Sequence, residues 1–459
     1  MEATAGEPSV ERRRLEAETL RVGRELAAQH PAATRHPWRS LDAKAIELSA
    51  RDAELRAALF RLVEVTPACR SLDDLARHLG SFLKGLGDRP PPVAAALRMA
   101  ETKAGRTALG AAAAAGVRHI AHRFVVGDSP AAAMPTLARL WRDGIGASLD
   151  LLGEATVTSR EADRYADRCA EALDVLVAGV AGWPERPRLE HDSAGPLARA
   201  NLSVKVSALT PLLRADAPAR GRDDAAVRLR PLLRWARDLG AHLHVDMESL
   251  DSHETTLELL FELLAEGEFR AGPSVGLVLQ AYLRDSAAEL ERVLAWARAA
   301  ERDPPLVVRL VKGAYWDHEV VEARQHGWEA PVFEDKADCD RNFEVLSERL
   351  LDQVRIPPAL VRVAIGSHNL RSVAHVIAYD RLCGGDGGDI EFQVLRGLGD
   401  DLAEALSGEG LRVRAYCPVG DLVAGMSYLV RRLLENTANE SFLRVQASGA
   451  ELDELLSAP

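Results

Sequence analysis

The segment LRVRAYCPVGDLVAGMSYLVRRLLENTANESF, residues 411–442, joins a strand pattern to a helix pattern. Its first part alternates apolar residues up to Tyr416, which is typical of a β-strand. Pro418, Gly420 and Asp421 then favour a turn and a helix N-cap. The segment is therefore predicted to form one strand followed directly by one helix.

The same unit is repeated along the chain. Including this one, eight strand-like runs can be counted: ASLDLLGE (147–154), NLSVKVSA (201–208), HLHVDME (242–248), SVGLVLQA (274–281), PLVVRLVKG (305–313), VRVAIGSH (361–368), IEFQVLRG (390–397) and LRVRAYCP (411–418). Helix-compatible sequence follows each run, and their rich Val, Ile and Leu content suits parallel strands buried on both faces. Eight such units over about 300 residues predict an α/β fold, a (β/α)8 barrel. A doubly wound open sheet is the alternative, but no GxGxxG follows any strand.

The N-terminal third is predicted to be an all-helical arm. A polar amphipathic helix ends before Pro31, and Ser71 with Asp74 resembles the capping box of a later helix. An Ala-rich helix is expected over about 105–117. We predict three regions: 1–115, the arm and its linker helices; 116–445, the barrel; and 446–459, a C-terminal tail or linker.

Composition excludes several classes of protein. Hydrophobic residues make up 47% of the 459, enough for a large core. The net charge of −12 argues against a nucleic-acid partner. No apolar run approaches the ~20 residues of a membrane span, and no signal-peptide pattern opens the chain, so a cytoplasmic or peripherally attached protein is expected. The five cysteines show no CxxC or metal-ligand spacing.

Polar residues follow the predicted strands, where a barrel of this type places its chemistry. Every predicted strand end carries one or more: Glu154, Lys205, Asp246 with Glu248, Gln280, Arg309 with Lys312, His368 with Asn369, Gln393 and Tyr416. Isolated buried charges cost several kcal/mol unless they are paired or bind a ligand. We therefore interpret these residues as a site.

The helix after the last strand offers two interpretations. At 100° per residue, Tyr428, Arg431, Arg432 and Glu435 share one face. This face could be solvated, with an ion pair between Arg431 and Glu435. Alternatively, the two guanidinium groups could hold a carboxylate or phosphate. Helix geometry alone favours the solvated face.

Several segments resemble signatures of the proline dehydrogenase family, in particular the domain found in bifunctional proline utilization A enzymes. They are SVKVSAL (203–209), HVDMES (244–249), GLVLQAY (276–282), RLVKGAYWD (309–317), SHN (367–369), EFQVLRGLG (391–399) and AYCPVGDLVAGMSYLVRRLLENTANESF (415–442). They occur in the family's order over about 240 residues. RLVKGAYW and YLVRRLLEN are long and specific motifs.

The resemblance implies a distorted (β/α)8 barrel whose eighth helix lies over the strand ends. It implies FAD-dependent oxidation of L-proline to 1-pyrroline-5-carboxylate, the first step of proline catabolism, by hydride transfer to flavin N5. A quinone is the implied electron acceptor, with peripheral association at the inner face of the cell membrane. A homo-oligomer, or a link to a pyrroline-5-carboxylate dehydrogenase, is compatible with it.

The resemblance also implies roles for single residues. Lys205, Arg431 and Arg432 match the cations that hold the proline carboxylate, and the ring walls match Tyr315, Leu310, Ala314, Leu395, Tyr416 and Tyr428. The catalytic group comprises Arg309, beside N5, with Asp246 and Tyr416. The predicted FAD-binding residues are Gln280, Arg309, Lys312, Gly313, Trp316, Lys336, Ser367, His368, Asn369, Gln393, Glu435 and Ser441. No metal is predicted.

Two other classes of function stay open on the sequence. The first is a metal-dependent hydrolase or lyase, in which Asp246, Glu248 and His368 hold a metal and the arginine pair a phosphate. The second is a non-catalytic barrel that serves as an assembly module through its helical arm. Flavin absorbance in the purified protein distinguishes both from the oxidoreductase.

Overall fold

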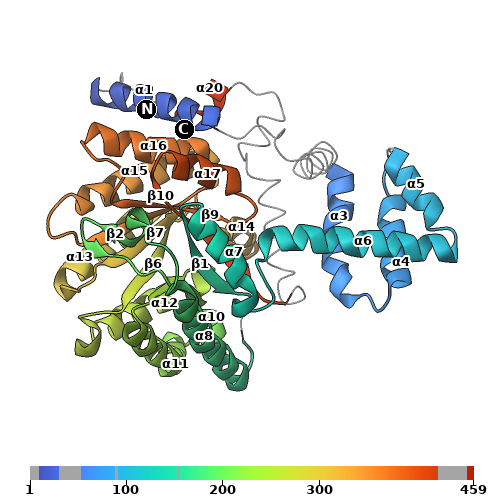
Figure 1. Ribbon diagram of the computed structural model, residues 1–459, viewed down its shortest axis with the longest axis horizontal. Helices are drawn as coiled ribbons and strands as arrows, with labels where there is room; N and C mark the ends of the chain where they lie inside the picture. The colour runs from blue at the N-terminus through green and yellow to red at the C-terminus, as the bar shows by residue number, and fades with distance from the viewer. Residues whose placement is uncertain (1–9, 30–52, 88–90, 154–155, 422–451) are drawn as a thin grey trace.

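The computed structural model describes residues 10–29, 53–87, 91–153, 156–421 and 452–459 (Figure 1). Eight parallel strands close into a barrel in the order β1-β10-β9-β8-β7-β6-β5-β4. They are β1 (Ile145–Leu151), β4 (Asn201–Lys205), β5 (His242–Asp246), β6 (Ser274–Gln280), β7 (Leu306–Val311), β8 (Val361–Gly366), β9 (Ile390–Leu395) and β10 (Arg412–Val419). Each coincides with a predicted run, so the barrel prediction is confirmed.

Helices surround the barrel and alternate with its strands (Figure 1). They are α7 (Pro130–Arg142), α8 (Ser159–Val180), α11 (Pro218–Leu239), α12 (Leu250–Leu264), α13 (Ser286–Ala300), α14 (Trp316–His326), α15 (Lys336–Val354), α16 (Leu370–Leu382) and α17 (Asp400–Gly408). Short elements fill the connections: α9 (Pro187–Glu190), α10 (Val206–Leu209), the hairpin of β2 (His191–Asp192) and β3 (Gly195–Pro196), and the 3-10 helix η3 (Gly267–Phe269). The hairpin was not predicted, since each of its strands is only two residues long.

Seven of the eight runs were predicted to continue one to three residues beyond the ends of their strands, and β10 ends one residue later than predicted. β4 stops at Lys205, because the next residues, predicted to be strand, form α10. β10 continues through Pro418 to Val419, although the proline suggested a turn. The Pro418 carbonyl accepts a hydrogen bond from Val126 N at 2.9 Å, outside the barrel, while the proline ring leaves no N–H at this position to be satisfied.

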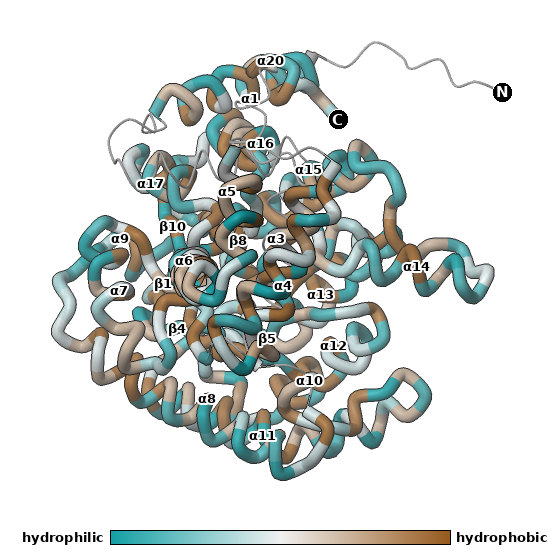
Figure 2. The backbone as a smooth tube through the Cα atoms, turned by 90° about the vertical axis from the view of Figure 1, so that its right-hand side faces the viewer, coloured by the Kyte–Doolittle hydropathy of each residue, from teal (hydrophilic) through white to brown (hydrophobic). Residues whose placement is uncertain are grey.

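The helices before the barrel fall into two groups, one packed on the barrel and one projecting from it. α1 (Val10–Gln29) lies along α16, beside the C-terminal α20 (Leu452–Leu455), whereas the remaining helices project away from the barrel (Figure 1). These are α3 (Ala53–Val65), the 3-10 helix η2 (Thr66–Ala68), α4 (Leu72–Lys84), α5 (Pro91–Met99) and α6 (Lys103–Phe124). Figure 2 looks along α6, with α3, α4 and α5 beside it. This group, the helical arm, has its own apolar core.

Two local predictions in the arm were partly right. α6 extends seven residues beyond the predicted end at 117, to Phe124. Ser71 does cap α4, accepting a hydrogen bond from Asp74 N at 3.1 Å. The reciprocal bond of a capping box is replaced, because the Asp74 carboxylate accepts from Arg70 N at 3.2 Å.

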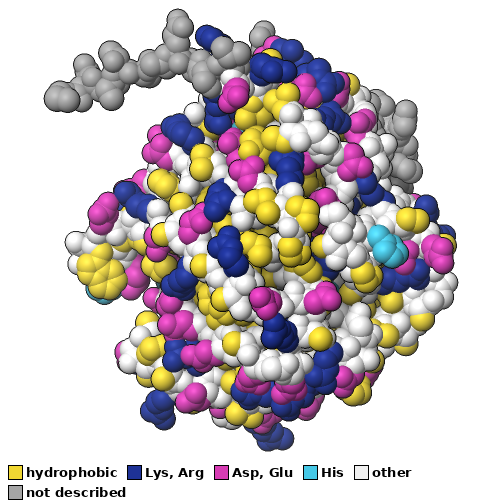
Figure 3. Space-filling view, turned by 90° about the vertical axis from the view of Figure 1, so that its left-hand side faces the viewer, with side chains coloured by type: hydrophobic (Ala, Val, Ile, Leu, Met, Phe, Trp, Pro, Cys, Tyr) yellow, Lys and Arg dark blue, Asp and Glu magenta, His cyan; other side chains and the backbone are white. Residues whose placement is uncertain are grey.

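The main apolar core lies between the strands and the surrounding helices. The barrel interior is polar, and its side chains bond across the lumen. The Tyr416 hydroxyl on β10, for example, donates to Asp246 on β5, a strand that does not neighbour β10. Outside, Lys, Arg, Asp and Glu side chains mix over the face shown in Figure 3. No described helix has the length and apolar character needed to cross a membrane.

Candidate active site

Five charged or phenolic side chains converge at the carboxyl end of the barrel. They come from β1, β4, β5, β7 and β10, and they are Asp150, Lys205, Asp246, Arg309 and Tyr416. In a parallel barrel these strand ends form one face, where loops rather than strands shape the site. The structure therefore brings together all three residues of the predicted catalytic group.

Asp246 connects the other two members of that group. Its Oδ1 lies 2.6 Å from Arg309 Nη1, and its Oδ2 accepts a hydrogen bond from the Tyr416 hydroxyl at 2.6 Å. The guanidinium carbon of Arg309 lies 5.5 Å from the centre of the Tyr416 ring, within cation–π range. One carboxylate thus fixes both a buried cation and an aromatic ring.

Ionisation in this group is set by burial and by the neighbouring charges. Burial, with Asp150 and Asp246, raises the pKa of Tyr416 well above its ordinary value, so the phenol stays protonated and can donate. The guanidinium group of Arg309 faces Asp246, and its Nη2 lies 3.4 Å from Ser203 Oγ. Its Nε is buried without a hydrogen-bond partner.

Lys205 forms a second ion pair, with Asp150. Burial acts to lower the pKa of Lys205, but the charges of Asp150 and Asp246 outweigh it and raise that pKa. Burial raises the pKa of Asp150, against the attraction of Lys205. The Lys205 ammonium group therefore keeps its proton at neutral pH, and the two residues titrate as a coupled pair.

Sequence reasoning missed Asp150. It took Glu154 as the polar end of the first strand, but residue 154 lies outside the described residues. A signal was present, since Ser148 and Asp150 alternate within an otherwise apolar run. Ser148 Oγ donates to Asn201 Oδ1 at 2.7 Å inside the barrel. Ser148, and with it Asp150 two residues later, therefore faces the lumen.

Gln280 is held in one orientation at the end of β6. Its amide nitrogen donates to the Glu248 carbonyl at 3.1 Å, and its Oε1 lies 3.0 Å from His253 Nδ1. His253 Nε2 in turn lies 2.5 Å from Glu289. Glu289 and Gln280 outweigh burial and raise the pKa of His253, which suits an imidazolium donating from both nitrogens. The Gln280 amide keeps a second N–H available.

The loop after β7 carries the next predicted residues. Lys312 and Lys336 each bond one oxygen of Asp340, so two cations share one carboxylate. Gly313 has φ +136°, and a Cβ there would lie 2.5 Å from the ring of Tyr282. Ala314 and Tyr315 follow, and Trp316 begins α14, its ring nitrogen donating to the Phe333 carbonyl at 2.8 Å.

The loop after β8 is held by its own hydrogen bonds. Ser367 Oγ accepts from Asn369 N at 3.1 Å, and Asn369 caps α16 through Ser372 N at 2.9 Å. His368 Nε2 accepts from Leu395 N at 2.8 Å, which joins this loop to the end of β9. Ser367, His368 and Asn369 remain partly exposed, as binding residues at this end must.

Two predicted site residues lie elsewhere. Leu310 alternates with Arg309, so it points outward into the core between strands and helices, where it is fully buried. Gln393 lies two residues before the end of β9 and donates to Glu391 Oε1 at 2.7 Å. It lines a cavity of about 30 Å³ together with residues from the beginnings of strands, such as Asn201 and Ser274. The structure does not bring either residue together with the others.

Part of the predicted site lies outside the described residues. This part comprises Tyr428, Arg431, Arg432, Glu435 and Ser441. The choice between a solvated face and an anion clamp on that helix therefore stays a prediction. The described residues alone supply one wall of the site, formed by the strand ends and the loops after β7 and β8.

The metal-site alternative does not fit the described geometry. Both oxygens of Asp246 are engaged by Arg309 and Tyr416, and His368 Nε2 accepts a backbone hydrogen bond. Within the described ranges, the one His/Cys/Asp/Glu group spaced like metal ligands lies in the helical arm, far along the chain from Asp246.

Comparisons with known proteins agree with this geometry. The family model described as proline dehydrogenase matches residues 133–445, and that of the proline utilization A N-terminal domain matches residues 16–124. The proline dehydrogenase of Deinococcus radiodurans is 31% identical, over 71% of this chain and 89% of its own length. The bifunctional protein PutA of Escherichia coli is 31% identical over 75% of this chain, but that match covers 25% of the longer protein.

A solved structure extends the similarity to three dimensions. Proline utilization A from Bdellovibrio bacteriovorus, inactivated by N-propargylglycine, superposes with a TM-score of 0.86 at 32% identity. The match covers 97% of this chain and 44% of that one. The family resemblance noted in the sequence is thus confirmed over most of the chain, which belongs to the proline dehydrogenase family.

Proposed function

We propose that this chain oxidises L-proline to 1-pyrroline-5-carboxylate, the first step of proline catabolism, with FAD as the hydride acceptor. The observation that carries the proposal is the pair of anchored cations, Arg309 on Asp246 and Lys205 on Asp150, at the carboxyl end of a proline dehydrogenase barrel. Both cations are positioned by the protein itself, which suits recognition of an anion without rearrangement.

The described residues fit FAD in three respects. Arg309 has a buried Nε without a partner, and Gln280 keeps one amide N–H to donate. Lys312 and Lys336 both bond Asp340, and two cations side by side at this end of the barrel suit a pyrophosphate. Gly313, packed on the Tyr282 ring at φ +136°, keeps side-chain atoms out of this loop. We assign these residues, with Trp316, Ser367, His368 and Asn369, to the cofactor, and Glu435 and Ser441 by resemblance.

FAD, when bound, supplies a two-electron acceptor for the hydride. Arg309, whose guanidinium group is fixed by Asp246 and Ser203, would stabilise the negative charge that the bound cofactor gains on reduction. We assign the proline carboxylate to Lys205, joined by Arg431 and Arg432. Tyr416, Tyr315, Ala314, Leu395 and Tyr428 would form walls around the ring.

The electron acceptor and partners are proposed on the resemblance. A quinone would receive the electrons, which would bring the protein to the membrane surface peripherally. This chain spans about a quarter of the bifunctional relatives it matches, so a link to a pyrroline-5-carboxylate dehydrogenase is part of the proposal. The regions 1–115, 116–445 and 446–459 are proposed as arm, barrel and tail.

The test is a flavin spectrum recorded without oxygen. The purified chain should show oxidised flavin absorbance, and L-proline at millimolar concentration should bleach it, whereas D-proline should not. A bound flavin that L-proline leaves oxidised would reject the activity. A protein that binds no flavin, even when FAD is added, would reject the cofactor.

A further inference from the structure

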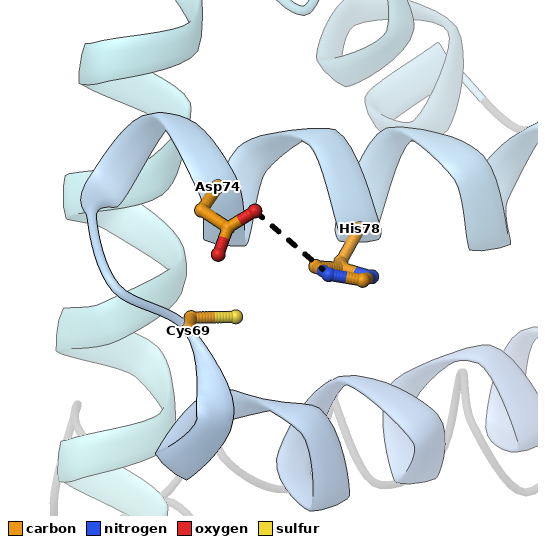
Figure 4. A group of neighbouring side chains, drawn as sticks. All are labelled: Cys69, Asp74 and His78. Carbon is orange, nitrogen blue, oxygen red and sulfur yellow. Dashed lines mark ion pairs between the residues drawn. The ribbon is translucent and has the colours of Figure 1, made fainter.

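Three possible metal ligands lie together in the helical arm, away from the proposed active site. Cys69, Asp74 and His78 each offer one ligand atom, and these atoms all lie within 4.8 Å of one another. Figure 4 shows the Cys69 sulfur, the Asp74 carboxylate and the His78 ring facing one space between the end of η2 and the first turns of α4. All three side chains are partly exposed, so an ion could reach them.

The backbone fixes the positions of these residues. Cys69 ends η2, with its N–H donating to the Thr66 carbonyl at 3.2 Å. Ser71 then caps α4 and sets its start, which places Asp74 in the first turn. His78 follows at i+4 on the same helix face. The chain therefore presents one ligand from a turn and two from one helix.

The Cys69 thiol donates to the Val65 carbonyl at 3.4 Å, a bond that a metal-bound thiolate would give up, since it has no proton to donate. Asp74 Oδ2 accepts from Arg70 N at 3.2 Å, while its Oδ1 lies 3.9 Å from His78 Nε2. Stabilisation of a helix N-terminus explains a carboxylate at Asp74. It does not explain a thiol and an imidazole facing that carboxylate.

We propose that Cys69, Asp74 and His78 bind a Zn²⁺ ion. Thiolate, imidazole and carboxylate are zinc's preferred ligand types, and three protein ligands with one water complete a tetrahedron. Ligand atoms around zinc lie about 3.3–3.8 Å apart, so closure needs movements of about 1 Å in these side chains. A cation between them also relieves the repulsion that a thiolate would meet beside Asp74.

Neighbouring charges are compatible with this site. Arg77 lies 3.5 Å from Asp74, but it lies closer, at 3.2 Å, to Asp73, which also binds Arg106 at 2.7 Å. Asp73 can therefore keep both arginines when a metal occupies Asp74. The ion would join the end of η2 to α4 and so stiffen the corner between α3 and α4.

The test measures metal binding on the full chain without an affinity tag. After incubation with Zn²⁺ and gel filtration, elemental analysis should find one equivalent of zinc. Cys69→Ser and His78→Gln should each weaken binding by about tenfold or more, since even changes behind metal ligands cost 10–100-fold. Cys383→Ser, at the exposed cysteine that follows α16, is the matched control and should bind as the parent does.

A second measurement identifies the ligands. Co²⁺ should give thiolate charge-transfer and visible d–d bands in the parent protein and in Cys383→Ser, and Cys69→Ser should lose the charge-transfer band. The proposal is overturned if no zinc is retained and no cobalt spectrum appears, or if the spectrum survives Cys69→Ser. Bleaching of flavin by proline should be the same with or without zinc, so the two proposals fail independently.

Discussion

At the scale of single residues, the proposed site depends on buried charges that are already paired. Asp246 holds Arg309, and Asp150 holds Lys205. Removing one partner of such a pair leaves an uncompensated buried charge, which costs more than the pair itself contributes. A loss of stability can therefore be separated from a loss of function only if the partner residue is also substituted, so that no buried charge is left unpaired.

Lys205→Met should show this separation. The single variant leaves Asp150 buried without its cation, so the free energy of unfolding should fall by about 3–5 kcal/mol. Lys205→Met with Asp150→Asn should recover most of that loss, because no charge remains unpaired. Denaturant unfolding measures both. The KM for proline should rise in both variants, and a double variant with normal KM would contradict the assignment of Lys205 to the carboxylate.

Tyr416→Phe tests the link between the phenol and Asp246. Hydrogen bonds to charged groups contribute about 1.5–3 kcal/mol, so kcat/KM for proline should fall about tenfold or more if the bond positions the site. Tyr379→Phe is the control, since its hydroxyl donates to Asp352 at 2.8 Å on the outer helices. Equal activity in the two variants would show that the hydroxyl has no role in catalysis.

At the scale of elements, a buried arginine fastens both ends of the described chain to the barrel. Arg371 on α16 bonds Glu16 of α1 at 2.6 Å, Glu344 of α15 at 2.8 Å and the Leu456 carbonyl at 2.7 Å. Arg24 of α1 also pairs with Asp453 of α20, but both side chains are more than half exposed. Arg371 thus ties α1 and the residue after α20 to the barrel from a buried position, whereas Arg24 joins α1 to α20 at the surface.

Arg371→Leu should therefore loosen α1 and α20, and Arg24→Leu should not. The first change leaves Glu344, 1% exposed, with the more distant Arg12 at 3.6 Å and His375 at 3.5 Å, and should cost up to about 3–5 kcal/mol. The exposed pair contributes roughly 0–1 kcal/mol. Hydrogen exchange of the backbone amides of residues 10–29 distinguishes the two variants, because only Arg371→Leu should reduce their protection. Similar protection of α1 in both variants would mean that apolar packing on α16, not Arg371, holds the helix.

At the scale of the whole molecule, apolar periodicity predicted the fold but not the barrel's interior. All eight strands lie where Val, Ile and Leu runs placed them, since outward positions of a buried strand must be apolar. The ends of β4 and β10 were missed, because α10 and the partner of Pro418 depend on contacts from distant segments. The docking of α1 on α16 had no sequence signal.

The candidate site, like the fold, was predicted in part. Arg309, Asp246 and Tyr416 were expected together and do meet, whereas Asp150 was missed and Leu310 was assigned without regard to strand parity. Contacts inside the lumen could not be derived, because inward side chains meet across strands that are distant in sequence. Arg309 Nη2 on β7, for example, lies 3.4 Å from Ser203 Oγ on β4, 106 residues away in the sequence.

Two of those interior residues predict how stability depends on pH. His242 Nδ1 bonds Ser274 at 2.8 Å, and its Nε2 lies 3.2 Å from His244 Nδ1. Burial, with the charge of Arg414, lowers the pKa of His242 to about 3, and burial also lowers the pKa of His244. Both rings are therefore neutral in the folded protein at pH values where the unfolded chain already binds protons.

Stability should consequently fall as the pH drops below the ordinary histidine pKa of about 6.5, at up to about 1.4 kcal/mol per pH unit for each ring. His242→Gln should reduce that slope by about this amount between pH 6.5 and 5, and His318→Gln, at an exposed position, should leave it unchanged. Glu391, whose pKa is lowered to about 2 because the charge of Arg414 outweighs burial, adds its own loss only below this window. Denaturant unfolding at several pH values measures the slope. If His242→Gln keeps the parent slope, the ring takes up its proton in the folded barrel, and the interior is more polar or more hydrated than its burial indicates.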